Sequence, residues 1–221
     1  MKHRKKYSHI DVAEAIEQQR CMARQVQERP FSGKIGVVAG ADAAFSKDEK
    51  YCIAAVVSFS WPNLELIETA EAKKPLNFPY IPGFLSFREA PAVAAAARKL
   101  KQKPDILLID GQGRAHPRRF GLACHVGLDL GWPTIGCAKS RLIGEHRPVG
   151  RKKGCQCRLM DKGELIGKVV RSRDDVKCLY VSVGHLMEMD EAVRVVLRCC
   201  RRYRLPEPTR QAHNLVSQNR R

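Results

Sequence analysis

The stretch KIGVVAGADAAF, residues 34–45, predicts the first strand of a buried sheet. After Lys34, Asp42 carries the one polar side chain in this run. On a strand, Asp42 shares a face with Gly40 and Ala44, and these small residues leave space over its carboxylate. A buried carboxylate without a partner is costly or becomes protonated, so the pattern predicts a cation beside Asp42. An ordinary aspartate at a turn or a sheet edge is the alternative.

The segments on either side of this strand predict an α/β domain. Residues 51–61 and 64–72 have the pattern of two more strands, and the short connection after residue 45 predicts a hairpin. Three antiparallel strands, a helix and then the apolar strand DILLID (105–110) predict a mixed sheet flanked by helices. The other expected elements are helices at 10–29, 86–101, 119–130, 189–203 and after 206–208, strands at 133–139, 164–172 and 177–183, a loop at 73–85 and a long excursion at 141–163.

The charge balance predicts a polyanionic partner. The 221 residues include 40 Lys and Arg against 23 Asp and Glu, which gives a net charge of +17. The basic residues cluster in MKHRKK at the start, in HRPVGRKK (146–153) and in RCCRRYR (198–204), and such clusters are typical of nucleic-acid binding. A basic surface that is merely solvated is the alternative.

The length and apolar content are those of a single domain over residues 1–221, with residues 1–9 as a basic N-terminal extension. No apolar run approaches the ~20 residues of a membrane span, and no apolar signal segment follows the basic start. We therefore expect a cytoplasmic protein without membrane contacts, and a monomer. The nine cysteines include no C-x-x-C pair, so we expect neither a zinc site nor a disulfide framework.

Two further acids stand where a purely structural role is not the only explanation. Asp110 ends the strand DILLID, and the carboxyl ends of such strands are where α/β folds place catalytic groups. The dipeptide Asp110-Gly111 is also an ordinary turn. Glu89 lies three residues after Ser86, which matches a helix capping box and gives Glu89 a structural explanation.

Taken together, Asp42, Glu89 and Asp110 indicate a nuclease. A carboxylate on the first strand, one at the start of the following helix and one at the end of the next strand have the order found in ribonuclease H-like nucleases. Carboxylate oxygens are suited to hold magnesium together with substrate phosphate. The metal can then activate a water and stabilise the leaving oxygen of a phosphodiester.

Several segments resemble the endonuclease V family closely and in the family's order, over roughly residues 35–215. The resemblance implies a ribonuclease H-like fold and a magnesium-dependent endonuclease acting at deaminated purines. It implies recognition of deoxyinosine in DNA and hydrolysis of the second phosphodiester on its 3′ side, leaving 3′-hydroxyl and 5′-phosphate ends. The matching segments are VAGADAAF, PYIPGFLSFRE, DILLIDGQGRAHPRRFGLACHVGL, PTIGCAKSRL, VGHLM and RLPEPTRQAH.

The resemblance also implies roles for particular residues. Asp42, Glu89 and Asp110 would be the catalytic carboxylates, with Asp42 and Asp110 as direct ligands of Mg²⁺, for which Mn²⁺ could substitute. Lys139 would face the scissile phosphate as a point charge. His213 would orient or deprotonate the attacking water held by the metal.

The loop PYIPG is expected to open the duplex and read the deaminated base. A base inside a duplex must be extruded before a pocket can hold it, and a stiff apolar wedge can fill the vacated space. Glycines let the main chain approach the base closely, although they could equally make turns. An apolar loop packed into the protein core is the alternative to the wedge, and His116 is a candidate for shaping the loop after Asp110 or touching a phosphate. The expected wedge residues are Pro79, Tyr80, Ile81 and Pro82, and the expected pocket residues are Gly83, Leu85, Gly111 and Gly113.

Three functions follow from these observations. The first is a repair endonuclease acting on deoxyinosine in damaged DNA. The second is the same chemistry on inosine-containing RNA, because the choice turns on contacts to the 2′-hydroxyl. The third is a nucleic-acid-binding module without catalysis, which the presence of all three carboxylates and Lys139 disfavours.

Overall fold

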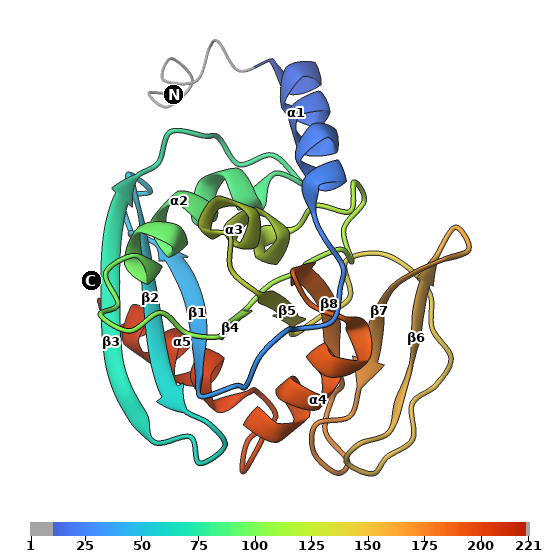
Figure 1. The fold of residues 1–221 in the computed structure, drawn as a ribbon. Coiled ribbons are helices and arrows are strands. Elements are labelled where there is room, and N and C mark those ends of the chain that lie inside the picture. The colour runs from blue at the N-terminus through green and yellow to red at the C-terminus, as the bar shows by residue number, and fades with distance from the viewer. Residues whose placement is uncertain (1–10, 220–221) are drawn as a thin grey trace.

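One mixed sheet organises residues 11–219, the part of the chain that this computed structural model describes (Figure 1). Within these residues the sheet has eight strands in the order β3-β2-β1-β4-β5-β8-β7-β6, which confirms the predicted mixed α/β fold. The basic extension 1–9 lies outside the described residues. In chain order the strands are β1 (Val37–Phe45), β2 (Tyr51–Ser60), β3 (Leu66–Pro75), β4 (Ile106–Ile109), β5 (Thr134–Ala138), β6 (Gln156–Asp161), β7 (Glu164–Val170) and β8 (Leu179–His185).

The first strand has an antiparallel neighbour on one side and a parallel neighbour on the other. β1 pairs with β2 in an antiparallel register from Val37↔Ser60 to Phe45↔Cys52, so the predicted hairpin is confirmed. On its other side β1 pairs with β4 in parallel, up to Ala41↔Ile109. The carboxyl ends of β1 and β4 therefore lie side by side, which brings the residues that follow them together.

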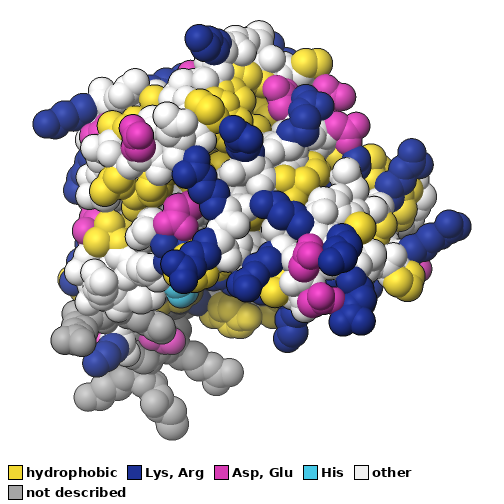
Figure 2. Space-filling view, turned by 90° about the horizontal axis from the view of Figure 1, so that it is seen from below, with side chains coloured by type: hydrophobic (Ala, Val, Ile, Leu, Met, Phe, Trp, Pro, Cys, Tyr) yellow, Lys and Arg dark blue, Asp and Glu magenta, His cyan; other side chains and the backbone are white. Residues whose placement is uncertain are grey.

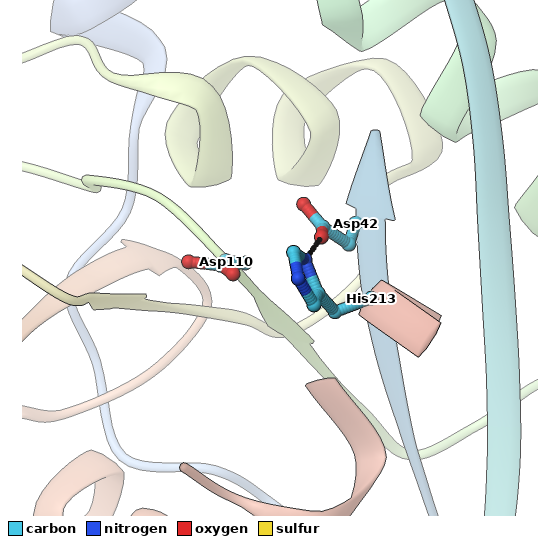
Figure 3. A group of neighbouring side chains, drawn as sticks. All are labelled: Asp42, Asp110 and His213. Carbon is cyan, nitrogen blue, oxygen red and sulfur yellow. Dashed lines mark hydrogen bonds and ion pairs between the residues drawn. The ribbon is translucent and has the colours of Figure 1, made fainter. Parts of the chain in front are cut away.

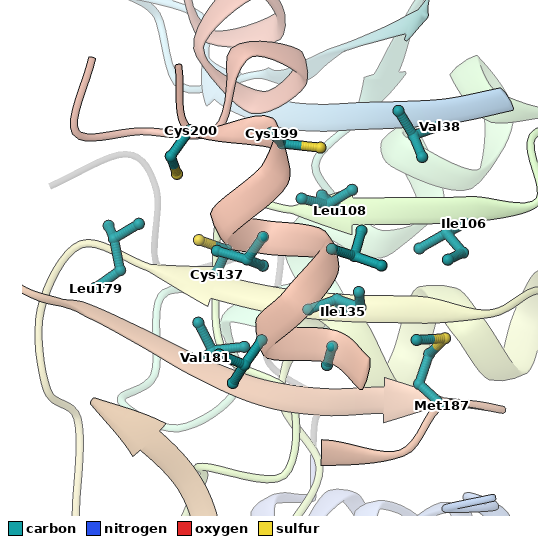
Figure 4. Packing of buried hydrophobic residues seen from close by; sticks show 14 of the residues in the cluster. Val38, Ile106, Leu108, Ile135, Cys137, Leu179, Val181, Met187, Cys199 and Cys200 are labelled. Atoms are coloured by element: carbon teal, nitrogen blue, oxygen red, sulfur yellow. The ribbon is translucent and has the colours of Figure 1, made fainter. Parts of the chain in front are cut away.

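Helices cover both faces of the sheet (Figure 1). Strand side chains alternate between the two faces. Val38 and Leu108 join one apolar core with α4, whereas Ala39 and Leu107 join the other core with α2 and α3. Figure 4 shows the first of these cores, which also holds three buried cysteines, Cys137, Cys199 and Cys200. The helices described are α1 (Val12–Gln25), α2 (Leu85–Ala97), α3 (Leu122–Leu130), α4 (Met189–Cys199) and α5 (Glu207–Asn219).

The expected long excursion at 141–163 is wrong in its second half. Residues 156–161 form β6, which makes an antiparallel pair with β7. β6 is an edge strand on which Leu159 alone is buried, so its sequence lacks the apolar alternation that identifies a strand. The helix expected at 10–29 ends at Gln25, where Val26 adopts an extended conformation.

None of the helices between residues 11 and 219 is both long enough and apolar enough to cross a membrane.

Candidate active site

Asp42 and Asp110 lie next to each other at the carboxyl edge of the central strands. Asp42 is near the end of β1, and Asp110 directly follows β4. The amide of Asp110 donates to the carbonyl of Ala41 over 3.0 Å, so the parallel ladder extends to both acidic positions. Their side chains are mostly buried, with exposed fractions of 13% and 10%. Burial, and then the negative charge of Asp110, raise the pKa of Asp42.

His213 reaches this pair from α5, as Figure 3 shows. Its Nδ1 atom lies 2.6 Å from Asp42 Oδ2. The position of α5 depends on Gly40, because a Cβ atom there would lie 2.1 Å from the backbone carbon of Pro208. The small residues on this face of β1 do leave space, as predicted. The first turn of α5 occupies that space and brings His213 to the Asp42 carboxylate.

The three side chains fit a divalent cation. One ligand atom from each of Asp42, Asp110 and His213 lies within 4.8 Å of the others. Two carboxylates and an imidazole suit a cation that prefers oxygen ligands and tolerates nitrogen. Asp110 Oδ2 is buried, and the Lys139 ammonium is its ion-pair partner among residues 11–219. One lysine faces two neighbouring buried carboxylates, so a cation between Asp42 and Asp110 would add the positive charge that the second one needs.

Glu89 lies on α2 and is buried, but it does not cap the helix. α2 begins at Leu85 with Phe84 at the N-cap position and without a side-chain cap, so the capping-box explanation is wrong. Ser86 falls inside the first turn, where its Oγ atom has no hydrogen-bond partner in the described chain. Burial raises the pKa of Glu89 to about 8, and the charges of Asp42 and Asp110 add to this shift. The three acids therefore share one electrostatic environment.

Lys139 directly follows β5, and its ammonium group forms an ion pair with Asp110. The lysine therefore places a positive charge at this edge of the sheet. Its backbone is held by Arg204, a residue that the sequence did not single out. The Arg204 guanidinium donates to the carbonyls of Lys139 (2.5 Å), Cys178 (2.7 Å) and Lys177 (2.8 Å). This arginine belongs to the motif RLPEPTRQAH, and it joins the loop before α5 to the residue that directly follows β5.

A separate cavity of about 220 Å³ lies at the start of α2. Its lining includes every expected wedge residue except Pro79. It also includes the expected pocket residues Gly83, Leu85 and Gly111. Tyr80 is 70% exposed at this cavity, so the loop does not pack its ring into the core. Gly113 does not line the cavity, because it packs tightly against the backbone of Val183. The lining residues are Tyr80, Ile81, Pro82, Gly83, Leu85, Ser86, Gly111, Gln112, His116, Gly121, Leu122 and Leu142.

Two lining residues, Gln112 and Leu142, were not among the sequence candidates. Leu142 is a large apolar residue with an exposed fraction of 52%, and Leu85 of the same pocket is exposed by 43%. Gln112 keeps its Oε1 atom buried and without a partner among the described residues, whereas its amide nitrogen donates to the carbonyl of Ser140. The pocket is therefore apolar around its opening, and Gln112 in its wall keeps a buried acceptor without a partner.

His116 lies in the pocket wall and is nearly fully buried. Burial lowers its pKa to about 4, so the imidazole is neutral at physiological pH. Nδ1 accepts from the amide of Arg118 over 3.3 Å, which leaves Nε2–H to donate to the carbonyl of Gly83 over 3.1 Å. These contacts are compatible with a histidine that shapes the loop, and both this role and a phosphate contact stay predictions.

Basic side chains cover much of the face seen in Figure 2, with fewer acidic ones among them. Part of the run HRPVGRKK is paired locally, since Arg151 and Lys152 bind Asp175 and Asp174. Lys153 instead lies with the arginines of α4 and the following loop along a hollow that includes Arg194, Arg198 and Arg201. Two of the basic clusters in the sequence therefore meet on one surface.

Comparison with known proteins gives consistent matches over nearly the whole chain. The family model Endonuclease V matches residues 19–214. An Endonuclease V of Nostoc sp. (strain PCC 7120) is 50% identical over 209 residues, which cover 94% of this chain and 95% of that protein. The crystal structure of Endonuclease V from Streptomyces avermitilis is similar with a TM-score of 0.90 at 35% identity, covering 95% of this chain and 92% of that one.

A further solved structure contains a nucleic acid. It is a Ciona intestinalis Endonuclease V in complex with a 23mer DNA containing an inosine followed by a ribo-adenosine. It matches with a TM-score of 0.83 at 27% identity, over 95% of this chain and 96% of that one. These matches confirm the predicted ribonuclease H-like fold. From residue 19 to residue 214 the sequence, the fold and the relatives agree, and the chain belongs to the endonuclease V family of nucleases, which act on phosphodiester bonds.

Proposed function

We propose that this protein recognises deoxyinosine in damaged DNA and hydrolyses the second phosphodiester bond on its 3′ side, with Mg²⁺ as cofactor and Mn²⁺ as a substitute. The observation that carries the proposal is the meeting of Asp42, Asp110 and His213, with ligand atoms within 4.8 Å of one another. The inosine-containing DNA bound by the Ciona intestinalis relative supports the choice of substrate. The expected products have 3′-hydroxyl and 5′-phosphate ends.

Asp42 and Asp110 would hold the cation, and Glu89 would complete the negative charge around it. When bound, the cation would activate a water and stabilise the charge that develops on the leaving oxygen. His213 contributes through its tautomer. Because a carboxylate oxygen can only accept, the contact with Asp42 places a proton on Nδ1, and in the neutral imidazole the Nε2 lone pair would face the attacking water. Lys139 places a positive charge where the scissile phosphate would bind.

The pocket at the start of α2 suits a base that presents a carbonyl. Deamination replaces the amino donor of adenine with an acceptor and turns N1 into a donor. The first turn of α2 offers amide donors that have no partner within the helix, and Leu85 and Ser86 of that turn line the pocket. Adenine, with the opposite donor and acceptor pattern, would leave these groups unpaired.

The wedge role makes Tyr80 the side chain that stacks in place of the extruded base. Tyr80→Ala is expected to weaken binding to inosine-containing duplex by about 5- to 150-fold, because stacking of a base on an aromatic ring contributes about 1–3 kcal/mol. Tyr80→Phe keeps the ring and should keep the affinity. Fluorescence anisotropy with a labelled duplex measures both variants. Tyr51→Ala, at an exposed tyrosine on β2, is the matched control, and an affinity for Tyr80→Ala equal to that of Tyr51→Ala would remove the wedge role.

A second candidate substrate is inosine-containing RNA. The strand bound by the Ciona intestinalis relative carries a ribo-adenosine directly after the inosine. A ribonucleotide at that position is compatible with an enzyme that also acts on RNA.

One nicking assay tests the proposal and separates the two substrates. End-labelled DNA and RNA strands of the same sequence, each with one inosine or with adenosine in its place, are incubated with the protein and Mg²⁺. The proposal predicts cleavage of the inosine-containing DNA at the second phosphodiester on its 3′ side and no cleavage of the adenosine strand. Cleavage of the RNA strand alone would assign the second candidate, and no cleavage of either inosine strand would overturn both.

A further inference from the structure

One backbone carbonyl at the edge of the pocket is held by three side chains. The carbonyl of Gly83 accepts from Gln19 Nε2 over 3.1 Å, from the Arg118 guanidinium over 2.6 Å and from His116 Nε2 over 3.1 Å. Gly83 directly follows the wedge residues 79–82 and lines the pocket. We call these three side chains the Gly83 clasp.

Gln19 connects α1 to the clasp. It is fully buried, although α1 is otherwise a mostly exposed helix that buries Ala15 besides Gln19. Its Nε2 atom donates to Gly83, and its Oε1 atom accepts from Nε of Arg118. Because a guanidinium can only donate, the orientation of the Gln19 amide is fixed. Both ends of this amide therefore serve the clasp.

The clasp sets the backbone where the wedge ends and α2 begins. Gly83 has φ +82°, and a Cβ atom there would lie 2.7 Å from the Arg118 guanidinium, so the position requires glycine. The same guanidinium lies 4.4 Å from the centre of the Phe84 ring, at the N-cap of α2. Arg118 thus contacts the two residues that join the wedge to the first turn of the helix.

We propose that Gln19, acting together with Arg118, is a positioning residue for recognition of the deaminated base. By fixing the carbonyl and the backbone of Gly83, the clasp orients the wedge and the first amides of α2 toward the base. α1 is then part of the base-reading apparatus, although Gln19 does not line the pocket. This inference rests on the proposed function, because it assumes that the pocket reads inosine.

Substitution of Gln19 tests the inference. Gln19→Ala removes both contacts of the amide, whereas Gln19→Glu keeps an acceptor for Arg118 and loses the donor to Gly83. Both variants are expected to lose about tenfold or more in affinity for inosine-containing duplex and in the ratio of inosine to adenosine cleavage. Gln18→Ala, at the exposed neighbour on the same helix, is the matched control and should behave like the wild type. Anisotropy gives the affinity, single-turnover nicking gives the ratio, and thermal unfolding gives the stability.

The outcomes separate a positioning role from a structural one. Loss of discrimination by Gln19→Glu at unchanged unfolding temperature supports the clasp, even if Gln19→Ala does not fold. A lower unfolding temperature in both variants with unchanged discrimination would overturn it and leave Gln19 as an anchor for α1. If the wild type nicks inosine strands selectively and the Gln19 variants discriminate equally well, the positioning role of the clasp is overturned. The proposed function then stands. A wild-type protein that does not distinguish inosine from adenosine overturns the proposed function and the clasp with it.

Discussion

Asp110→Ala is expected to lower the rate of nicking of inosine-containing DNA by about 10³-fold or more while binding to that DNA survives. A divalent cation contributes several kcal/mol of charge stabilisation, and each ~1.4 kcal/mol is a factor of ten in rate. The variant should fold, because removal of the charge relieves repulsion with Asp42 and Glu89, and Lys139, which loses its ion-pair partner, is partly exposed to solvent. Single-turnover nicking and anisotropy on the same duplex measure the two effects.

The control for Asp110 is an exposed acid outside the cluster of Asp42, Glu89 and Asp110. Asp48→Ala changes the same charge on the exposed connection between β1 and β2 and should leave the nicking rate unchanged. If Asp110→Ala unfolds, or if it nicks at the rate of Asp48→Ala, Asp110 is not the cation ligand proposed above.

Glu89→Gln is expected to change how stability depends on pH in metal-free protein. The folded protein raises the pKa of Glu89 from 4.5 to about 8, so the folded state binds a proton that the unfolded state has released. This contribution to stability is complete below pH 4.5 and is lost as the pH rises to 8. Between pH 6.5 and 8 the wild type should lose about 2 kcal/mol more than Glu89→Gln, since one pKa unit corresponds to ~1.4 kcal/mol. Urea unfolding in chelator at the two pH values measures the difference.

This pH window isolates the carboxylate. Burial lowers the pKa of His116 and His125 to about 4, which makes stability rise with pH up to about 6.5 and would mask the effect of Glu89 at lower pH. Glu65→Gln, at an exposed glutamate, is the matched control and should follow the wild type. Equal pH dependence in Glu89→Gln and the wild type would contradict a protonated Glu89 beside Asp42 and Asp110.

The sequence was sufficient for the elements with strong local patterns. The apolar run around Asp42 and the strand before Asp110 predict β1 and β4, and their parallel pairing brings both acids together. β6 escaped prediction because an exposed edge strand has little apolar alternation. The start of α2 was misplaced because the Ser86–Glu89 spacing imitates a cap, whereas the N-cap is Phe84 and the helix begins at Leu85.

Site residues that lie in a recognisable sequence motif could be named in advance. Residues that reach the site only through the tertiary fold could not. His213 was expected from its motif, but its approach to Asp42 depends on Gly40, which lets α5 cross β1 at close range. Arg204 and Gln19 act through backbone carbonyls of distant segments, Lys139 and Gly83. A hydrogen bond to a carbonyl places no demand on the side chain of the residue that accepts it, so neither contact leaves a local pattern.

The dependence of wild-type nicking on a divalent cation tests the proposed site most directly. The protein is dialysed against a chelator, and nicking of an inosine-containing duplex is then measured as Mg²⁺ or Mn²⁺ is added back. We predict no nicking in chelator, full recovery with Mg²⁺ and recovery with Mn²⁺, because Asp42 and Asp110 are proposed to act through the cation they bind. Nicking that persists unchanged in excess chelator would contradict a metal-dependent site at these two carboxylates.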